Sequence, residues 1–318
     1  ILVLLIGALM VAGCADTTPP ATPTPTPTPS PTATTPSPTA TPEIQQELYI
    51  ATTTSLYDTG LLDHLQSIFE DEHDVALKIV SAGTGIALEY GQRGDVDVMM
   101  VHDRAREDTF LADGYGTNRK VFAYNYFVIV GPEDDPASIA GMEPEEAFTT
   151  LMEEGATNPD VKFVSRGDNS GTHGKEKAIW ASAGYDYATD IQGSGDWYVE
   201  AGAGMGATLV LANEQVAYTL SDIGTYLAYQ GDLDLVVLVD QGDILLNLYS
   251  AMMINSDQFP DVNSTLAKEW INFLISDEIQ DEIGSFGVAE YGRPLFYPAK
   301  GQWEELGVPM EETETPIP

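Results

Sequence analysis

The chain has 318 residues, of which 50 are Asp or Glu and 13 are Lys or Arg, so its formal net charge is −37. This balance excludes a nucleic-acid-binding protein that works through a basic surface, because phosphate contacts need clustered Lys and Arg. It also argues against docking on an anionic membrane surface. Taken alone, the charge favours a cation or a basic protein as the partner. The 43% of hydrophobic residues suffice for one large core or two smaller ones.

The first residues have the composition of an export signal. Residues 1–13 are apolar, too short to span a bilayer, and end in small residues, so we expect a signal peptide truncated at its start. Residues 11–14, VAGC, resemble a prokaryotic lipobox. This predicts that Cys14 is lipidated and anchors the protein to the outer face of the cytoplasmic membrane; the alternative is a leftover cysteine in a cleaved signal. Cys14 is the only cysteine, which excludes a disulfide framework and a thiol metal site.

A linker rich in Thr and Pro is expected over residues 14–47. Such a segment can neither bury apolar area nor pair its backbone, so it is expected to be extended, and its hydroxyls could carry sugars. Only three acidic residues fall in 1–47, and the rest of the chain carries 47 acidic against 13 basic residues, a net charge of −34. We interpret this acidity as a solvation feature of the outer surface, suited to a salty exterior where the repulsion is screened.

Strands and helices alternate from Leu48 onward. Strands are expected at 48–52, 75–80 and 96–102, with helices at 61–73 and 86–94 between them. The third strand is almost entirely apolar, as buried parallel strands are. This βαβαβ order predicts a parallel sheet with helices packed on its faces.

A long strand-like run at 121–131 is expected to cross between two lobes, because it is too long for one of them. A second alternation of elements follows it. Helices are expected at 145–154, from Gly171, from Met205, at 267–275 and at 277–283, and strands at 161–167, 197–202, 215–222, 236–240 and 248–254. We therefore expect a first lobe from 48–127 and 248–305, a second lobe at 128–247, and a loose acidic tail at 306–318.

Three turns rich in Ser, Thr and Gly each follow a predicted strand and open a predicted helix. They are 52–55 (TTTS), 81–85 (SAGTG) and 165–173 (SRGDNSGTH). The carboxyl ends of parallel strands are where ligands bind, and a helix N-terminus offers free N–H groups to an anion. Each turn alone is better explained as a helix cap, since Ser and Thr are preferred there. Three of them, one carrying Arg166, favour an anion site.

Arg166 directly follows an apolar strand. Its planar guanidinium suits a tetrahedral oxyanion, which accepts two parallel hydrogen bonds. Asp168 is expected to hold the guanidinium by a salt bridge; the alternative is that it accepts a proton from a ligand such as hydrogen phosphate. The glycine-rich stretch 201–208 fails as a dinucleotide fingerprint. It is either a close-approach turn at the rim of the site or a helix-packing feature.

Taken together, TTTS, SAGTG, GDVDVMMVH, YNYFVIVGPEDDP, SRGDNSGTHGKE and WYVEAGAGMGATLVLANEQVAYTLSD resemble the tungstate-binding proteins of ABC transporters. The resemblance covers about Leu48 to Pro298. It implies a type II periplasmic-binding-protein fold, in which two α/β lobes with mainly parallel sheets are joined by crossing strands. It also implies an extracytoplasmic receptor that binds tungstate or molybdate between the lobes for a membrane permease, as a monomer without a cofactor.

The resemblance assigns ligand roles to the three turns, with Asp168 behind them and His173 facing outward. The implied oxyanion ligands are Thr53, Thr54, Ser55, Ser81 and Thr84 from the first lobe and Arg166, Ser170, Gly171 and Thr172 from the second.

Two other functions compete with a tungstate receptor. Phosphate-binding proteins share an Arg-x-Asp-x-Ser-Gly-Thr pattern, which makes a phosphate receptor the alternative. A serine hydrolase is more distant, because Ser170 and His173 are only three residues apart and no pattern supplies an orienting third member. The four histidines have no metal-ligand spacing.

Overall fold

The computed structural model describes residues 46–318, which form a compact unit. The expected signal peptide, Cys14 and nearly all of the linker lie outside the described residues. Within 46–318, no helix combines the length and the apolarity needed to cross a membrane.

The elements are β1 (Gln46–Thr53), α1 (Thr54–Asp58), α2 (Leu61–Glu72), β2 (Val75–Ala82), α3 (Thr84–Arg93), β3 (Val98–Val101), α4 (Arg104–Ala112), β4 (Gly116–Pro132), α5 (Pro144–Gly155), β5 (Phe163–Ser165), α6 (Gly171–Ser182), a π-helical turn (Tyr187–Ile191), β6 (Tyr198–Glu200), α7 (Met205–Glu214), β7 (Thr219–Asp222), α8 (Ile223–Tyr229), β8 (Leu235–Val239), β9 (Leu246–Ile254), α9 (Ser264–Leu274), α10 (Asp277–Ser285), α11 (Val288–Tyr291), β10 (Tyr297–Pro298) and α12 (Met310–Thr313), with 3₁₀ turns at Gln230–Asp232 and Asp243–Leu245.

The predicted βαβαβ unit forms the start of the fold. β1 pairs in parallel with β2 on one side and with β3 on the other, with Ile50 opposite Ile79 and Val98. All four residues of β3 are buried, which explains its unbroken apolar run. The carboxyl ends of the three strands therefore lie at one edge of the sheet, where α1, α3 and α4 begin.

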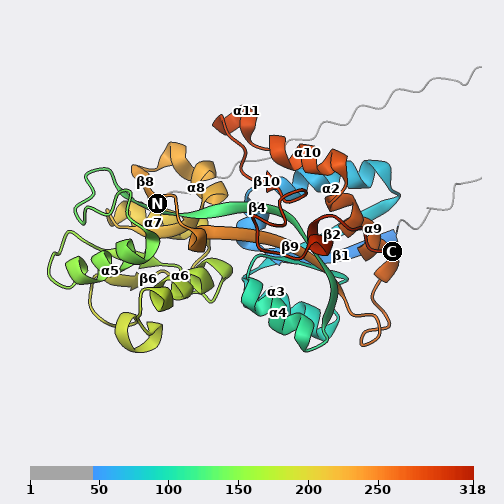
Figure 1. Ribbon diagram of the computed structural model, residues 1–318, viewed down its shortest axis with the longest axis horizontal. Coiled ribbons are helices and arrows are strands. Elements are labelled where there is room, and N and C mark those ends of the chain that lie inside the picture. The colour runs from blue at the N-terminus through green and yellow to red at the C-terminus, as the bar shows by residue number, and fades with distance from the viewer. Residues whose placement is uncertain (1–45) are drawn as a thin grey trace, which may run out of the picture. The chain divides into compact units, whose positions relative to one another are not determined.

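Strand β4 is the crossing segment that the sequence predicts. Up to Tyr126 it pairs antiparallel with β9, and from Phe127 it pairs with β7 and β8. β9 also pairs antiparallel with β3, so the sheet is mixed. Figure 1 shows β4 and β9 running side by side, from the region of β1, α3 and α4 to that of α5 to α8. We call 46–127 with 248–318 the first lobe and 128–247 the second lobe.

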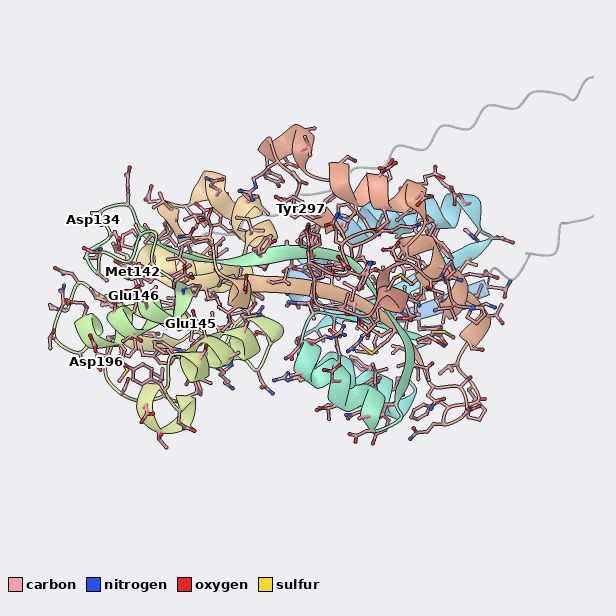
Figure 2. The ribbon with its side chains drawn as sticks, viewed as in Figure 1. Asp134, Met142, Glu145, Glu146, Asp196 and Tyr297 are labelled. Atoms are coloured by element: carbon pink, nitrogen blue, oxygen red, sulfur yellow. The ribbon has the colours of Figure 1, made fainter. Side chains whose placement is uncertain are left out.

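The second lobe has a core of its own. β5 and β6 pair in parallel. The rings of Phe163 from β5, Phe148 from α5 and Trp180 from α6 pack against one another in this core. β5 is shorter than the predicted strand at 161–167, because the chain leaves the sheet at Arg166 and Gly167 adopts φ +60°. Exposed carboxylates such as Asp134 and Glu146 project outward from this lobe (Figure 2).

The expectation of a loose C-terminal tail was wrong. Glu312 belongs to the short helix α12. Its Oε2 lies 2.6 Å from Arg104 Nη1 and its Oε1 lies 3.1 Å from Arg119 Nη2, so ion pairs join α12 to α4 and β4. Ile317 is buried against the main core, and its backbone N–H donates to Asn272 Oδ1 at 2.7 Å. The tail is therefore held in place by the ion pairs of Glu312 with two arginines and by the burial of Ile317.

Candidate anion-binding site

The turn after β1 is both a helix cap and part of a buried polar cluster. Thr53 caps α1, since its Oγ1 accepts a hydrogen bond from Leu56 N at 3.3 Å. Ser55 is buried, and its Oγ lies 3.0 Å from His102 Nε2. Thr54 is half-buried between them. Capping and anion binding are compatible at this turn, because Thr53 caps α1 by accepting a hydrogen bond and a hydroxyl that accepts one bond can still donate another.

The second turn places one half-buried and one buried hydroxyl at the same edge of the sheet. Ser81, near the end of β2, lies opposite Thr52 in the sheet register. Thr84 is the first residue of α3, and Gly83 before it makes no side-chain cap. The backbone N–H groups of this helix start are therefore not covered by a capping side chain and remain available to an anion.

Arg166 and Asp168 form the predicted salt bridge. Arg166 is buried, and its Nε lies 3.1 Å from Asp168 Oδ2, to which Nη2 also donates. The other carboxylate oxygen accepts from Ser170 N at 3.1 Å. Partial burial acts to raise the pKa of Asp168, but Arg166 and Ser170 outweigh it and hold that pKa below its usual value. Both oxygens of Asp168 thus serve to orient Arg166 and the turn.

Helix α6 directs its N-terminus toward the first lobe. Ser170 caps it, with Oγ accepting from His173 N at 3.2 Å. Gly171 follows, where a Cβ would lie only 3.1 Å from His102 Cε1, so a side chain would crowd the imidazole. Because His102 belongs to the first lobe and also contacts Ser55, this close approach places Gly171 of the second lobe and Ser55 of the first lobe around the same imidazole.

A direct clasp also joins the lobes beside the site. Arg106 at the start of α4 donates through Nη1 to Asn169 O at 2.8 Å and through Nη2 to Asn169 Oδ1 at 2.6 Å. Asn169 has φ +60°, a left-handed conformation that Asn adopts more readily than most residues, and in it both its carbonyl and its side-chain oxygen accept from Arg106. The clasp therefore fixes the residue that directly precedes the Ser170 cap.

Several buried hydroxyls of these turns have no hydrogen-bond partner among residues 46–318. They are the Oγ1 atoms of Thr52, Thr84 and Thr172. Burying a hydroxyl without a partner costs about 1–3 kcal/mol, so native proteins rarely leave one unpaired. One such group from each of the three predicted turns, near a buried arginine, is what an oxyanion site without its ligand should show.

Two cations lie in this part of an otherwise acidic protein, and both act on the pKa of His102. Arg166 is buried, and Lys175 of α6 is half-buried and donates to the carbonyl oxygens of Ile244 and Leu246 at 2.8 and 2.9 Å. Burial lowers the pKa of Lys175. A dianion placed here would meet two cations and neutral donors, whatever the charge of the outer surface.

His173 was expected to face outward, and this was wrong. Its side chain is buried, with Nδ1 accepting from Asn169 N at 3.0 Å and Nε2 lying 2.9 Å from the Tyr187 hydroxyl. Only its backbone N–H bonds to Ser170 Oγ. The ring supports the turn, and Ser170 has no imidazole partner of the kind that a hydrolase needs.

Sequence reasoning missed His102, although it ends the third predicted strand at the ligand-binding edge of the sheet. Its ring lies between Ser55 Oγ and Asn247 Oδ1, both at 3.0 Å. This order of groups resembles a nucleophile relay, but burial lowers the pKa of His102 to about 4. A base that weak is far from the pKa near the working pH that general-base catalysis favours.

Among residues 46–318, no group of three or more His, Cys, Asp or Glu side chains is placed to hold a metal ion. The site combines neutral donors, a buried arginine and helix N-termini, a set of groups that suits a small anion. Together with two sheets joined by crossing strands, it defines a solute-binding protein of the periplasmic type II class.

Comparison with known proteins agrees with this class. A family model described as PBP superfamily domain matches residues 26–278. A Haloferax volcanii protein named as an ABC transporter anion-binding protein is 49% identical over 260 residues, covering 80% of this chain and 72% of the relative. Tungstate-binding protein TupA of Peptoclostridium acidaminophilum is 41% identical over 251 residues, covering 79% and 85%.

A solved structure agrees as well. The tungstate ABC transporter protein from Geobacter sulfurreducens superposes with a TM-score of 0.68 at 46% identity, covering 77% of this chain and 100% of that one. The chain belongs to the PBP superfamily, and within it to the family of tungstate-binding proteins of ABC transporters.

Proposed function

We propose that this protein captures tungstate, and molybdate as a close analogue, outside the cytoplasm and delivers it to the permease of an ABC transporter. The observation that carries the proposal is the set of unpaired hydroxyls of Thr52, Thr84 and Thr172, one in each predicted turn, together with the buried Arg166 in the third turn. Neutral donors and one guanidinium match a tetrahedral dianion without requiring a proton on the ligand. The names of the relatives support the same ligand.

Both lobes contribute ligands in this proposal, and closure of the cleft strengthens each hydrogen bond by excluding water. Asp168 orients Arg166 and does not touch the anion. The proposed ligand set is the one that the resemblance implies: Thr53, Thr54, Ser55, Ser81, Thr84, Arg166, Ser170, Gly171 and Thr172. The unpaired hydroxyl of Thr52 adds one further donor to it.

Calorimetric titration with tungstate, molybdate, sulfate and phosphate tests the ligand. We expect tungstate and molybdate to bind much more tightly than phosphate. Tighter binding of phosphate would move the chain to the phosphate receptor that the Arg-x-Asp-x-Ser-Gly-Thr pattern allows. Absence of binding to all four anions would remove the receptor function.

We further propose that Cys14 carries the lipid that holds the protein at the membrane, with the linker 14–47 as a tether. The support is the VAGC sequence that ends in this cysteine. When the full gene is expressed in a bacterial or archaeal host, the protein should enter the detergent phase on extraction, and the Cys14→Ser variant should enter the aqueous phase. Equal partitioning of both proteins would contradict lipidation at this residue.

A further inference from the structure

A chain of four buried hydrogen bonds leads from the anion site to a backbone carbonyl. Ser55 Oγ lies 3.0 Å from His102 Nε2, and His102 Nδ1 lies 3.0 Å from Asn247 Oδ1. Asn247 Nδ2 lies 2.9 Å from Asn125 Oδ1, and Asn125 Nδ2 lies 3.3 Å from Leu295 O. The four side chains are at most 6% exposed. While the imidazole is neutral, each side chain between the two ends donates to one neighbour and accepts from the other, so the chain has one direction throughout.

The carbonyl of Leu295 fixes that direction, because a carbonyl can only accept. Asn125 must therefore present its NH₂ to Leu295 and its oxygen to Asn247. Asn247 in turn presents its NH₂ to Asn125 and its oxygen to His102. An amide oxygen can only accept, so His102 carries a proton on Nδ1.

The same logic fixes the hydroxyl of Ser55. A neutral imidazole with its proton on Nδ1 has a bare lone pair on Nε2. Ser55 must then donate its single hydroxyl proton to His102 and can offer only lone pairs to the anion site. An oxyanion oxygen next to that hydroxyl would meet repulsion where the proposed ligand set requires a donor.

We propose that oxyanion capture carries one proton into the protein, and that this proton is held on Nε2 of His102. The added N–H donates to Ser55 Oγ, which frees the hydroxyl proton of Ser55 to bond to the anion. Only the last link of the chain reverses, while Asn247, Asn125 and Leu295 keep their bonds. The inference rests on the proposed function, because it assigns Ser55 to the bound oxyanion.

The surroundings of the ring explain why the proton arrives with the anion and not before it. Burial lowers the pKa of His102 to about 4, against the effect of the bond to Asn247, and the cations Arg166 and Lys175 lower it further. The uncharged rings of Phe127 and Tyr249 stack on the imidazole. A bound dianion would offset both cations and raise the pKa.

The sign of the pH dependence follows from these two states. Between the pKa of about 4 in the free protein and the higher pKa in the complex, the complex holds one more proton than its components. In that window the association constant falls about tenfold for each unit by which the pH rises. Above the pKa of the complex, the affinity no longer depends on this group.

Calorimetry in buffers of different ionisation enthalpy measures the number of protons taken up. At pH 6, we expect the wild-type protein to take up about one proton per tungstate. Imidazole ¹⁵N NMR provides an independent readout that needs no variant. It should show a bare Nε2 on His102 in the free protein and two protonated nitrogens in the complex.

His102→Gln assigns the proton to the ring, because its amide reaches the position of Nε2 with a permanent N–H donor. This variant should bind tungstate without proton uptake and with a flat pH profile. His64→Gln is the matched control, since His64 is half-exposed on α2 and pairs with Glu282. It should retain the wild-type proton count.

The outcomes separate the inference from the proposed function. Tight binding with no proton uptake and a neutral His102 in the complex would overturn the inference and leave the receptor function intact. Proton uptake that persists in His102→Gln would place the proton elsewhere and overturn it too. Failure to bind any oxyanion would overturn the function and this inference with it. If His102→Gln does not fold, the proton count and the NMR spectra of the wild-type protein still show whether His102 takes up a proton when the anion binds.

Discussion

Replacement of Arg166 by Gln tests the centre of the proposed site. The guanidinium is almost fully buried and is held by Asp168, so it is oriented before the ligand arrives. A hydrogen bond to a charged group contributes about 1.5–3 kcal/mol, and the planar fork can make two to one oxyanion. Loss of one such bond alone corresponds to roughly 10- to 150-fold weaker binding. We expect Arg166→Gln to weaken tungstate binding by on the order of 100-fold.

Asp168, the partner of Arg166, should make the loss of tungstate affinity in Arg166→Gln larger than the lost hydrogen bonds alone would cause. Without the guanidinium, Asp168 becomes a partly buried carboxylate with no cation, close to where a dianion must bind. The double variant Arg166→Gln/Asp168→Asn removes that charge and should recover part of the affinity. Arg93→Gln, which breaks an exposed pair with Asp95, is the control for loss of one positive charge.

Isothermal titration at constant ionic strength gives all of these affinities. An Arg166→Gln affinity within about twofold of wild type would remove Arg166 from the site, since that is less than the smallest charge-assisted bond. A double variant weaker than the single one would show that Asp168 contributes more than orientation and repulsion. Either result would refute the reasoning.

Three further predictions follow from individual contacts. Arg106→Gln should release the clasp on Asn169 and speed oxyanion dissociation by about 2- to 10-fold in stopped-flow fluorescence, with the association rate nearly unchanged; an unaltered dissociation rate would exclude the clasp from closure. Thr172→Val should weaken binding yet raise the free energy of unfolding of the ligand-free protein by about 1 kcal/mol, because the hydroxyl it removes has no partner among 46–318; a loss of stability on chemical denaturation would show that the hydroxyl is bonded after all. Burial raises the pKa of Glu176 to about 7, so the folded state holds a proton that the unfolded state releases near 4.5, and stability should fall as the pH rises through this interval. Glu176→Gln should flatten that slope in denaturant titrations, and an unchanged slope would assign it to another group.

The course of the chain was largely predictable because its elements have clear periodicity. The run at 121–131 was expected to cross, and β4 does change partner strands within it. Helix α4 was missed because its inward face is weakly apolar, with only Glu107 and Phe110 buried. The tail was misjudged because its anchors, Arg104 and Arg119, lie about 200 residues away in sequence.

The site was predictable as far as local sequence determines it. Hydroxyl turns after strands and an arginine after an apolar strand are local patterns, and the predicted pair of Arg166 and Asp168 is two residues apart. The partnership of His102 with Asn247 is not local, since it depends on the antiparallel register of β3 and β9. His173 was misplaced for a similar reason, because its ring is held by Tyr187, which lies beyond the end of α6.

The position of the asparagine pair has a mechanical consequence. Asn125 and Asn247 face each other on β4 and β9, one residue before β4 leaves β9 for the strands of the second lobe. Among the described residues, β4 pairs with strands of both lobes and β9 starts beside it there, so a change in the angle between the lobes would bend the chain near this pair. Bending would shift the amide oxygen on which the imidazole of His102 rests, and with it the acceptor for Ser55. The angle between the lobes and the direction of one hydroxyl proton are thus set at the same point of the protein.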